Sequence, residues 1–370
     1  MSDPAFLKSL LVHATPMMDT RAPVEFATGS LPSAVNLPLM SDEERAKVGT
    51  CFKYNGQDAA IRLGNKLVSG EVREHRMAEW IAFVKQHPHG YLYCARGGLR
   101  SHTVQQWLAD AGYDYPLVPG GFKAIRRFLI DSLESQSKEN TFVVLSGRTG
   151  TGKTRILNQL SNSLDLEGHA NHRGSSFGRR VTPQPTQINF EHRITLDLLK
   201  STFQTTVVED ESQVIGRLHL PDCFHHRLQA SPIVVVEQSL EVRVENVLQD
   251  YVTELSLEYI NALGPEQGFE AYQASMLAAI DRVKKRLGGL LWQDIRTQLS
   301  DALALHQRTG DIEAHRVWIA RLLSHYYDRM YDYQLSLKQE RVLGIAQGDS
   351  ASLAEQVSVW APPTQIDGLT

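Results

Sequence analysis

The pattern of apolar and polar residues changes twice along the chain. Up to about residue 130, strand-like apolar runs such as 90–94 alternate with helix-patterned stretches such as 78–86 and 101–113. This alternation predicts a parallel sheet with helices on its faces. Residues 132–140 (SLESQSKEN) are polar, and we expect a linker there.

The pattern restarts after this polar stretch. Continuous β-branched runs at 141–147, 205–211 and 231–239 predict three buried parallel strands. From about Val242 onward the apolar residues take helical spacing. The last twenty residues contain Pro362 and Pro363 and little periodicity, which predicts a loosely held tail. We therefore expect an α/β protein in four parts, with the boundaries 1–135, 136–245, 246–350 and 351–370.

Composition narrows the class of protein. A chain of 370 residues suits two domains with additions, and 42% apolar with 22% charged residues is typical of a soluble globular protein. No apolar run approaches the roughly 18 residues that a membrane span needs. The segment 1–11 lacks a signal-peptide pattern, so we expect a cytoplasmic protein. The net charge of −4 means that any contact with nucleic acid must come from a local basic patch.

The three cysteines, Cys51, Cys94 and Cys223, do not form a disulfide framework or a zinc site. Their number is odd, and no two of them stand at C-x-x-C spacing. Each is therefore judged by its own surroundings, and we expect no metal site built from protein ligands alone.

A phosphate-binding loop follows the run 141–147. The pattern G-x-x-x-x-G-K-T, here Gly147 to Thr154, has a strand before it and a predicted helix, 155–164, after it. Gly147, Gly150 and Gly152 allow backbone N–H groups to turn around an anion. We expect Lys153 to reach the terminal phosphates and the Thr154 hydroxyl to hold Mg²⁺.

Three carboxylates, Glu209, Asp210 and Glu211, end the second strand of this domain. One of them is placed to bind Mg²⁺ through water, as Walker B residues do, although an acidic strand end exposed to solvent has the same pattern. We take Glu209 and Asp210 as candidates, although the pattern does not show which of the three carboxylates matters.

Cys94 opens a second strand–loop–helix turn, CARGGLRS. Its backbone N–H groups would surround the sulfur, and Arg96 and Arg100 add positive charge, so both favour a thiolate. Such a thiolate can attack an electrophilic sulfur, selenium or phosphorus atom. The spacing of a cysteine, five residues and an arginine also describes a phosphatase loop, so the loop alone leaves two enzyme classes open.

Upstream residues resemble the opening of a rhodanese domain. They are Asp19-Thr20-Arg21-Ala22-Pro23-Val24-Glu25-Phe26 and the turn at 29–38, and the closing turn Val118-Pro119-Gly120-Gly121-Phe122 matches as well. The resemblance covers about residues 8–132 and implies a cysteine that carries chalcogen atoms.

A rhodanese domain followed by a P-loop domain is similar to the tRNA 2-selenouridine synthases. The stretches 172–178 (HRGSSFG) and 184–191 also look like signatures of that family. The resemblance implies a rhodanese-like domain, a P-loop NTPase-like domain and a helical C-terminal extension. It further implies that the sulfur of a wobble 2-thiouridine in a tRNA anticodon stem-loop attacks geranyl diphosphate, and that selenium from selenophosphate then replaces the S-geranyl group. On this hypothesis the P-loop binds the diphosphate, Cys94 holds selenium as a selanyl adduct, and the protein is a monomer.

A basic surplus marks the middle of the chain. Between Ser146 and Arg193 there are seven Arg or Lys and three Asp or Glu. Candidate contacts to tRNA or phosphate lie there and in the helical cluster 281–286; they are His172, Arg173, Arg179, Arg180, Lys284 and Lys285. Tyrosines 326, 327, 331 and 333 have the spacing of core residues, and stacking on an unpaired base is the alternative.

Two other functions remain open at this point. One is an ATP-dependent tRNA sulfurtransferase with a persulfide on Cys94. The other is a non-catalytic tRNA-binding protein that changes shape with a nucleotide at Lys153.

Overall fold

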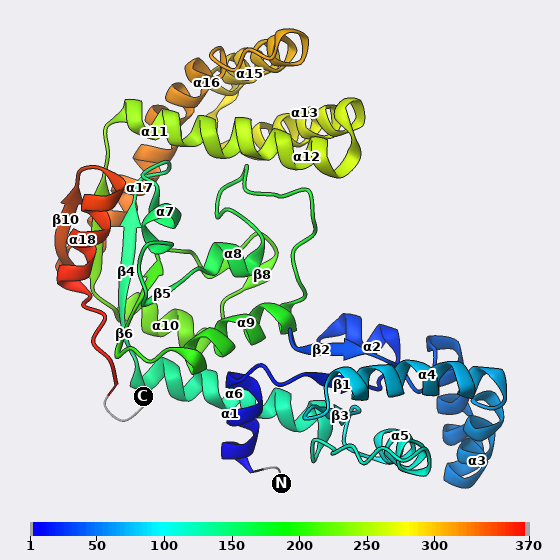
Figure 1. Cartoon of the computed structure of the whole chain (residues 1–370). Helices are drawn as coiled ribbons and strands as arrows, with labels where there is room; N and C mark the ends of the chain where they lie inside the picture. Colours follow the sequence, from blue (N-terminus) through cyan, green and yellow to red (C-terminus); the bar gives the residue numbers. More distant parts are fainter. Residues whose placement is uncertain (1–2, 367–370) are drawn as a thin grey trace. The chain divides into compact units, whose positions relative to one another are not determined.

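The computed structural model describes residues 3–366, which form two compact units. The first unit contains the chain up to residue 135 together with residues 186–200, and the second contains 136–185 and the chain from 201 on. Figure 1 labels many of the elements of both units. The return of 186–200 to the first unit is not predicted by the residue pattern, which placed that segment in the second domain.

The first unit is built on a parallel sheet of three short strands, in the order β2–β1–β3. Met17 is paired with Ala34 on one side and with Tyr91 on the other. The elements of the unit are α1 (Pro4–Val12), β1 (Met17–Asp19), α2 (Pro23–Thr28), β2 (Ala34–Asn36), α3 (Asp42–Leu67), α4 (Glu71–Gln86), β3 (Tyr91–Tyr93), α5 (Leu99–Asp110), α6 (Gly121–Glu139) and α9 (Gln187–Lys200).

Helix α9 joins the first unit through both apolar and polar contacts. Leu196 packs in the cluster formed by Leu7, Leu10 and other residues. Asn189 Oδ1 accepts a hydrogen bond from the Ser30 N–H (2.8 Å). The helix therefore contributes to the core of this unit, although it follows the phosphate loop in sequence.

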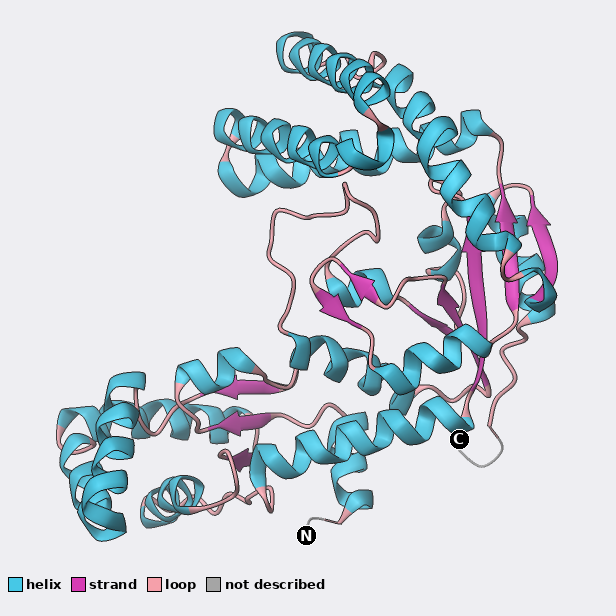
Figure 2. Ribbon diagram, turned by 180° about the vertical axis from the view of Figure 1, so that it is seen from behind, coloured by secondary structure: helices cyan, strands magenta, loops and turns pink. Residues whose placement is uncertain are grey.

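The second unit contains a five-stranded parallel sheet, in the order β10–β9–β4–β6–β5. Figure 2 shows the strands of each sheet lying side by side. The strands of the second unit are β4 (Thr141–Gly147), β5 (Ser163–Leu164), β6 (Thr205–Glu209), β7 (Val214–Ile215), β8 (Leu218–His219), β9 (Ile233–Glu237) and β10 (Val342–Gln347), of which β7 and β8 form a separate antiparallel pair. Its first helices are α7 (Lys153–Leu157), α8 (Leu166–Ala170) and α10 (Asp222–Ala230).

A group of helices with its own apolar core follows β9. Trp318 and Tyr272 lie in this core, and each is at most 1% exposed. The elements are α11 (Leu240–Val247), η1 (Leu248–Glu254), α12 (Leu255–Leu263), α13 (Pro265–Arg282), α14 (Lys284–Leu287), α15 (Gly289–Thr309), α16 (His315–Leu322), η2 (Leu323–Tyr327), α17 (Asp328–Ser336) and η3 (Gln339–Arg341), and α18 (Ser350–Trp360) follows β10. These findings confirm a mixed α/β fold with parallel sheets and a largely helical C-terminal part. No helix of the described chain combines the length and the apolar character that crossing a membrane requires.

The expected linker at 132–140 is wrong, because α6 continues through it to Glu139. The stretch contains no Gly or Pro, and Glu, Gln and Lys are good helix formers. Leu133 and Ser137 are buried, so one face of this helical end packs against the protein. Polarity alone was misleading here because a helix needs only one apolar stripe.

The expected tail from residue 351 is also wrong where the structure describes it. Helix α18 begins after Asp349, whose side chain accepts from the Ser352 N–H, and Leu353 and Val357 are buried against the sheet. Strand β10 precedes it inside the part expected to be helical, and pairs in parallel with β9. Residues 367–370 of the expected tail lie outside the described residues.

The helix after the phosphate loop is shorter than expected. It ends at Leu157, and Ser163–Leu164 forms β5 instead. The Ser163 hydroxyl donates to the Leu157 carbonyl (2.8 Å) and the Asn162 side chain donates to the Thr205 carbonyl (2.9 Å). Serine and asparagine here bond to the backbone, which competes with continuation of a helix.

Candidate functional site

Cys94 is the first residue after β3, and the loop that it opens leads into α5. The turn at 118–122 supports this loop, since the Phe122 N–H donates to the Cys94 carbonyl (2.9 Å). Gly121 has a φ of 57°, and a Cβ there would lie 2.2 Å from the Cys94 carbonyl oxygen. Only glycine therefore fits at this position, and the turn fixes the backbone of the Cys94 loop.

The Cys94 sulfur is buried among polar groups. The residue is 3% exposed, and Sγ lies 3.2 Å from Ser101 Oγ and 3.9 Å from the Gly98 carbonyl oxygen. Burial raises the pKa of the thiol, but hydrogen bonds from the Ser101 hydroxyl and from backbone N–H groups of the loop outweigh it, so the pKa lies below its ordinary value. The surroundings thus favour a thiolate, in a site more enclosed than the sequence suggested.

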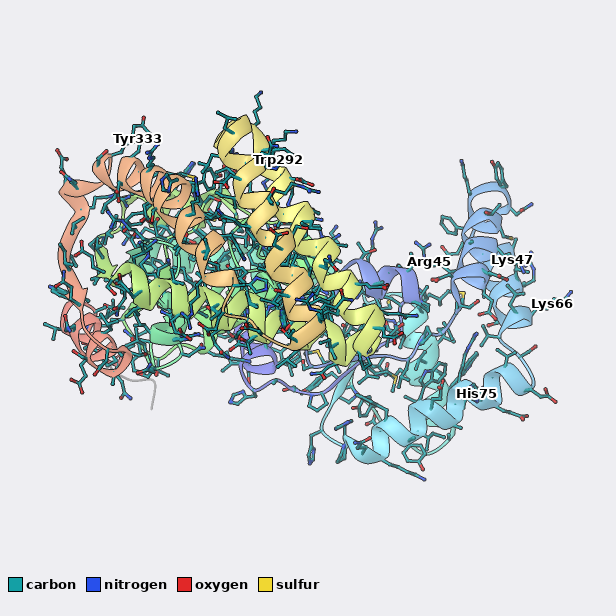
Figure 3. The ribbon with its side chains drawn as sticks, turned by 90° about the horizontal axis from the view of Figure 1, so that it is seen from above. Arg45, Lys47, Lys66, His75, Trp292 and Tyr333 are labelled. Atoms are coloured by element: carbon teal, nitrogen blue, oxygen red, sulfur yellow. The ribbon has the colours of Figure 1, made fainter. Side chains whose placement is uncertain are left out.

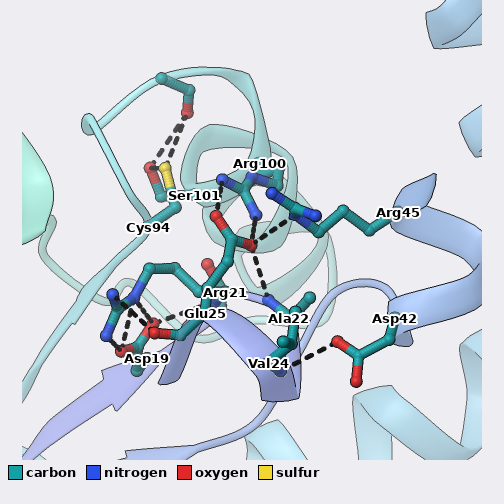
Figure 4. A network of polar contacts seen from close by, with 12 residues as sticks. Asp19, Arg21, Ala22, Val24, Glu25, Asp42, Arg45, Cys94, Arg100 and Ser101 are labelled. Carbon is teal, nitrogen blue, oxygen red and sulfur yellow. Dashed lines mark hydrogen bonds and ion pairs between the residues drawn. The ribbon is translucent and has the colours of Figure 1, made fainter. Parts of the chain in front are cut away.

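Arg100 is paired with a carboxylate (Figure 4). Its Nη1 donates to Glu25 Oε2 (2.6 Å) and its Nη2 to Glu25 Oε1 (3.1 Å), while Arg45 Nε lies 3.1 Å from Glu25 Oε2. Burial raises the pKa of Glu25, but the bonds and charge of Arg100, with the charge of Arg45, outweigh it, so the pKa lies below its ordinary value. Arg96 is exposed, and its bond to the Cys94 sulfur comes from its backbone N–H, as one of several N–H groups of the loop. The positive charge expected around the sulfur is therefore partly neutralised.

A buried ion pair at the end of β1 supports the same site. Arg21 donates to both oxygens of Asp19 (2.6 to 3.0 Å), and its guanidinium lies 3.7 Å from the centre of the Phe122 ring. The Asn36 side chain donates to the backbone carbonyls of both members of the pair. The stretch that resembles a rhodanese opening thus supplies the framework of the Cys94 site rather than its reactive groups.

The phosphate loop lies between β4 and α7, as expected. Gly150 and Gly152 have φ of 87° and 79°, which suits glycine. A Cβ on Gly147 would lie 2.7 Å from the Val236 carbonyl oxygen, so β9 passes too close for a side chain. Lys153 Nζ donates to the Gly147 carbonyl (2.8 Å), which places the ammonium group inside its own loop.

Residues of the helical part hold this loop from the outside. Arg243, 2% exposed, donates to the Thr149 carbonyl (2.9 Å) and forms two bonds with the Asp328 carboxylate. The Asn246 side chain donates to the Gly150 carbonyl (2.8 Å). The C-terminal helices therefore complete the phosphate loop, a role that the sequence did not indicate.

Of the three candidate carboxylates, Glu209 and Asp210 accept hydrogen bonds from other parts of the second unit. Glu209 is 1% exposed and accepts from the Leu166 N–H (2.9 Å), and burial, with Asp165 and Glu167 nearby, raises its pKa strongly. Asp210 accepts from the Ser146 hydroxyl (2.6 Å) and from Lys338 Nζ (2.8 Å).

Glu211 is the third carboxylate, and its pKa responds to the charge of Lys153 in the phosphate loop. It shares a hydrogen bond with Glu167, and the charge of Lys153 acts on both. Burial raises the pKa of each, followed for Glu211 by repulsion from Glu167, so the surroundings of the pair disfavour two charged carboxylates side by side. Glu167 was not predicted from sequence; its place in the first turn of α8, the helix that follows β5, is the signal that could have found it. Within residues 3–366, no group of three or more His, Cys, Asp or Glu side chains is arranged to hold a metal ion.

The predicted tRNA-contacting residues separate into two sets. His172, Arg179 and Arg180 line one pocket, together with arginines of other segments. Arg173 instead donates to Glu254 (2.9 Å) and to the Asp250 carbonyl. Lys284 lies over the Trp292 ring (3.9 Å), and Lys285 is exposed outside the pocket lining.

The tyrosines also divide. Tyr326 and Tyr327 belong to the helical core and are at most 8% exposed. Tyr331 lies 3.3 Å from the Ser146 hydroxyl, near the phosphate loop. Tyr333 is 67% exposed and stands out from its helix in Figure 3. Two of the four tyrosines therefore serve packing of the helical core.

Comparisons with known proteins agree with the sequence resemblance. A family model described as the tRNA 2-selenouridine synthase AAA domain matches residues 140–361. A tRNA 2-selenouridine synthase of Marinobacter nauticus is 53% identical to this chain, over 90% of this chain and 92% of the relative. Proteins of the same name from Pseudomonas syringae pv. syringae (52% identical, 90% and 92% covered) and Azotobacter vinelandii (50% identical, 92% and 94% covered) match similarly. The matches span nearly the whole of each protein, and the chain therefore belongs to the tRNA 2-selenouridine synthase family.

Proposed function

We propose that this enzyme replaces the sulfur of a wobble 2-thiouridine in tRNA by selenium, in two steps that use geranyl diphosphate and then selenophosphate. The observation that carries the proposal is the presence, in one chain, of a thiol whose surroundings favour the thiolate and of a phosphate loop with a lysine inside it. The names of the relatives indicate the product, 2-selenouridine in tRNA. The two co-substrates are what the sequence resemblance implies.

The phosphate loop suits the first step. The base sulfur attacks the first carbon of the geranyl chain, a C–S bond forms, and the C–O bond to diphosphate breaks. Lys153 exchanges its bond to the Gly147 carbonyl for the phosphate oxygens, and the loop N–H groups bind the same charge. Charge neutralisation is needed most as diphosphate leaves, so these groups act on the transition state.

The residues around Lys153 fit a Mg²⁺ ion that accompanies diphosphate. Glu167 and Glu211 are a half-buried carboxyl pair with raised pKa values, and such a pair gains from a nearby cation. The Thr154 hydroxyl and Glu211 would hold the ion, the latter through water. Bound Mg²⁺ supplies charge neutralisation for the leaving group.

Cys94 suits the second step. Attack of its thiolate on the phosphorus of selenophosphate forms an S–P bond and breaks the P–Se bond, which releases hydrogen selenide. The selenide then attacks the base carbon, where a C–Se bond forms and the C–S bond breaks, and the sulfur leaves with its geranyl chain as geranylthiol. Water hydrolyses the S–P bond of Cys94, which releases phosphate and returns the thiol. This route balances without an oxidant, whereas the selanyl adduct expected from sequence requires oxidation of the selenium by two electrons.

The test is mass spectrometry of nucleosides from 2-thiouridine-containing tRNA, incubated with geranyl diphosphate, selenophosphate or both. We expect S-geranyl-2-thiouridine with the first alone and 2-selenouridine with both. Cys94→Ser should retain geranylation and lose selenation, and Lys153→Ala should lose geranylation first. Full selenation by Cys94→Ser would remove Cys94 from the mechanism. Rapid ATP turnover with thiolated tRNA, without a geranylated product, would favour an ATP-dependent sulfurtransferase instead.

A further inference from the structure

The second unit contains a pocket of ≈ 660 Å³ beside the stretch 171–184. The β7–β8 hairpin and the residues around α14 complete its lining. We call it the arginine pocket, because its lining includes five arginines and no Asp or Glu; they are Arg179, Arg180, Arg217, Arg282 and Arg286. Arg179 and Arg180 were candidate contacts from sequence, and Arg282 and Arg286 lie in the basic cluster 281–286 that the sequence also indicated, whereas Arg217 had no such signal.

The positive charge of the arginine pocket is largely uncompensated. Within residues 3–366, Arg180 is the one of the five with a carboxylate partner, Glu258 (3.3 Å). Arg282 and Arg217 donate to the backbone carbonyls of Ser176 and Gln184. Like charges held together without counterions raise the free energy of the folded protein, and a bound anion removes that cost.

Burial and the repulsion between the positive charges of the pocket lower the pKa values of two groups in its lining, His172 and Arg282. Burial lowers the pKa of His172, and the charges of Arg179 and Arg282 lower it further. Burial and Arg179 likewise lower the pKa of Arg282. The guanidinium groups are thus close enough to act on each other, and a single ligand can meet more than one of them.

The lining favours a nucleotide over the two small co-substrates. A geranyl chain needs an apolar wall, but Val214 and Pro183 stand among arginines, hydroxyls and amides. A lone selenophosphate would occupy only a small part of a space this large. Arginine binds phosphate in a bidentate manner, and its planar group stacks on unpaired bases, so several arginines suit a base with phosphates on both sides.

The arginine pocket adjoins the phosphate loop through Gly174. Gly174 lines the pocket, and a Cβ on it would lie 2.5 Å from Glu211 Oε1 and 2.7 Å from Glu167 Oε1. These two carboxyl groups are the ones on which the Lys153 charge acts. One side of the Gly174 backbone thus faces the pocket, and the carboxyl pair of the phosphate loop contacts the same residue.

We propose that the arginine pocket receives one nucleotide of the RNA substrate, with Arg179 and Arg282 binding its flanking phosphates. This inference rests on the proposed function for the identity of the RNA. It adds where in the second unit the nucleotide binds, next to the loop that holds the diphosphate.

The test is the binding of a fluorescein-labelled anticodon stem-loop RNA with 2-thiouridine to the full chain, followed by anisotropy at several salt concentrations. Arg179→Ala should weaken RNA binding about tenfold. It should also reduce, by about one, the slope of the logarithm of the binding constant against the logarithm of the salt concentration. Arg308→Ala removes the same charge from an exposed position on α15 and should change binding less than about twofold. Arg286→Ala, a second pocket variant, should behave like Arg179→Ala.

A parallel measurement of geranyl diphosphate binding by equilibrium dialysis separates the outcomes. We expect Arg179→Ala to leave it unchanged. Loss of geranyl diphosphate binding with intact RNA binding would assign the pocket to the small co-substrate and overturn the inference. Equal losses of RNA binding in the Arg179 and Arg308 variants would overturn it as well. If wild-type protein binds RNA through Arg179 but forms no geranylated or selenated nucleoside, the proposed function fails and the RNA site stands.

Discussion

The Ser101 hydroxyl lies 3.2 Å from the Cys94 sulfur and 3.0 Å from the Gly98 carbonyl oxygen. A hydroxyl has one proton to donate. While Cys94 is a thiol, Ser101 can donate to the carbonyl and accept from the sulfur. Once the thiol has lost its proton, the hydroxyl can turn and donate to the thiolate. Ser101 therefore stabilises both states, and the charged state gains the stronger bond.

Ser101→Ala should raise the pKa of Cys94 by about one unit, because a hydrogen bond to a charged group contributes about 1.5–3 kcal/mol and part is recovered from neighbouring N–H groups. The measurement is the rate of iodoacetamide labelling of Cys94 against pH, followed by peptide mass spectrometry. Cys51 and Cys223 in the same sample are internal controls whose profiles should not move. An unchanged Cys94 profile would show that the backbone N–H groups alone set its pKa.

Glu25→Gln should change how stability depends on pH. The folded-state pKa of Glu25 is lowered, mainly by Arg100 against the effect of burial. A lowered pKa adds stability above the ordinary value of 4.5, and this contribution is lost as pH falls through the folded value. The free energy of unfolding of the wild type should therefore exceed that of the variant by about 1 kcal/mol at pH 7, and the two values should converge in acid.

Thermal unfolding of both proteins checks this prediction. The measurements run from about pH 3 to pH 7, a range that covers the titration of carboxyl groups. Glu79→Gln is a control, since Glu79 is a partly exposed carboxylate whose recorded ion-pair partner is His75. A constant difference between wild type and Glu25→Gln over the whole range would mean that Glu25 acts through shape rather than charge.

The sequence predicted those parts of the fold whose signal is local. The β-branched runs became β4, β6 and β9, and the glycine pattern after β4 became the phosphate loop with positive φ at Gly150 and Gly152. Each of these features depends on residues within one short window. Local patterns therefore sufficed for the sheet centre and for the glycine-rich turn after β4.

Features that depend on distant residues were not predicted. Strand β10 has apolar residues but shows no clear alternation of apolar and polar positions, because an edge strand buries few side chains; Ala346 is its one buried residue. Trp360 packs where a Cβ on Gly344 would lie, which joins α18 to the same edge. Likewise, Arg217 and Arg282 enter the arginine pocket from separate segments, and no spacing in the sequence links them.

Gly150→Ala should be more damaging than Gly288→Ala, although both glycines have φ near 80°. At Gly288 nothing lies within 4 Å of an added Cβ, so backbone strain alone costs about 1–3 kcal/mol. At Gly150 the added Cβ would also lie 2.6 Å from the Arg243 carbonyl oxygen, which adds about 1–3 kcal/mol. Differential scanning calorimetry measures the two losses, and equilibrium dialysis should show lost geranyl diphosphate binding only for Gly150→Ala. Equal stability and binding for the two variants would contradict the close approach.

Arg243→Met should lower the free energy of unfolding by about 3–5 kcal/mol, because it removes one partner of a buried ion pair and leaves Asp328 without its counterion. The same change removes the bond to the Thr149 carbonyl, so the phosphate loop loses an outside support.

The double variant Arg243→Met with Asp328→Leu replaces the pair by apolar side chains and should regain most of the stability. It cannot regain the bond to Thr149, so geranyl diphosphate binding should stay weak in both variants. Urea unfolding and equilibrium dialysis on the three proteins separate the two roles. Full recovery of binding in the double variant would show that Arg243 supports the loop only through overall stability.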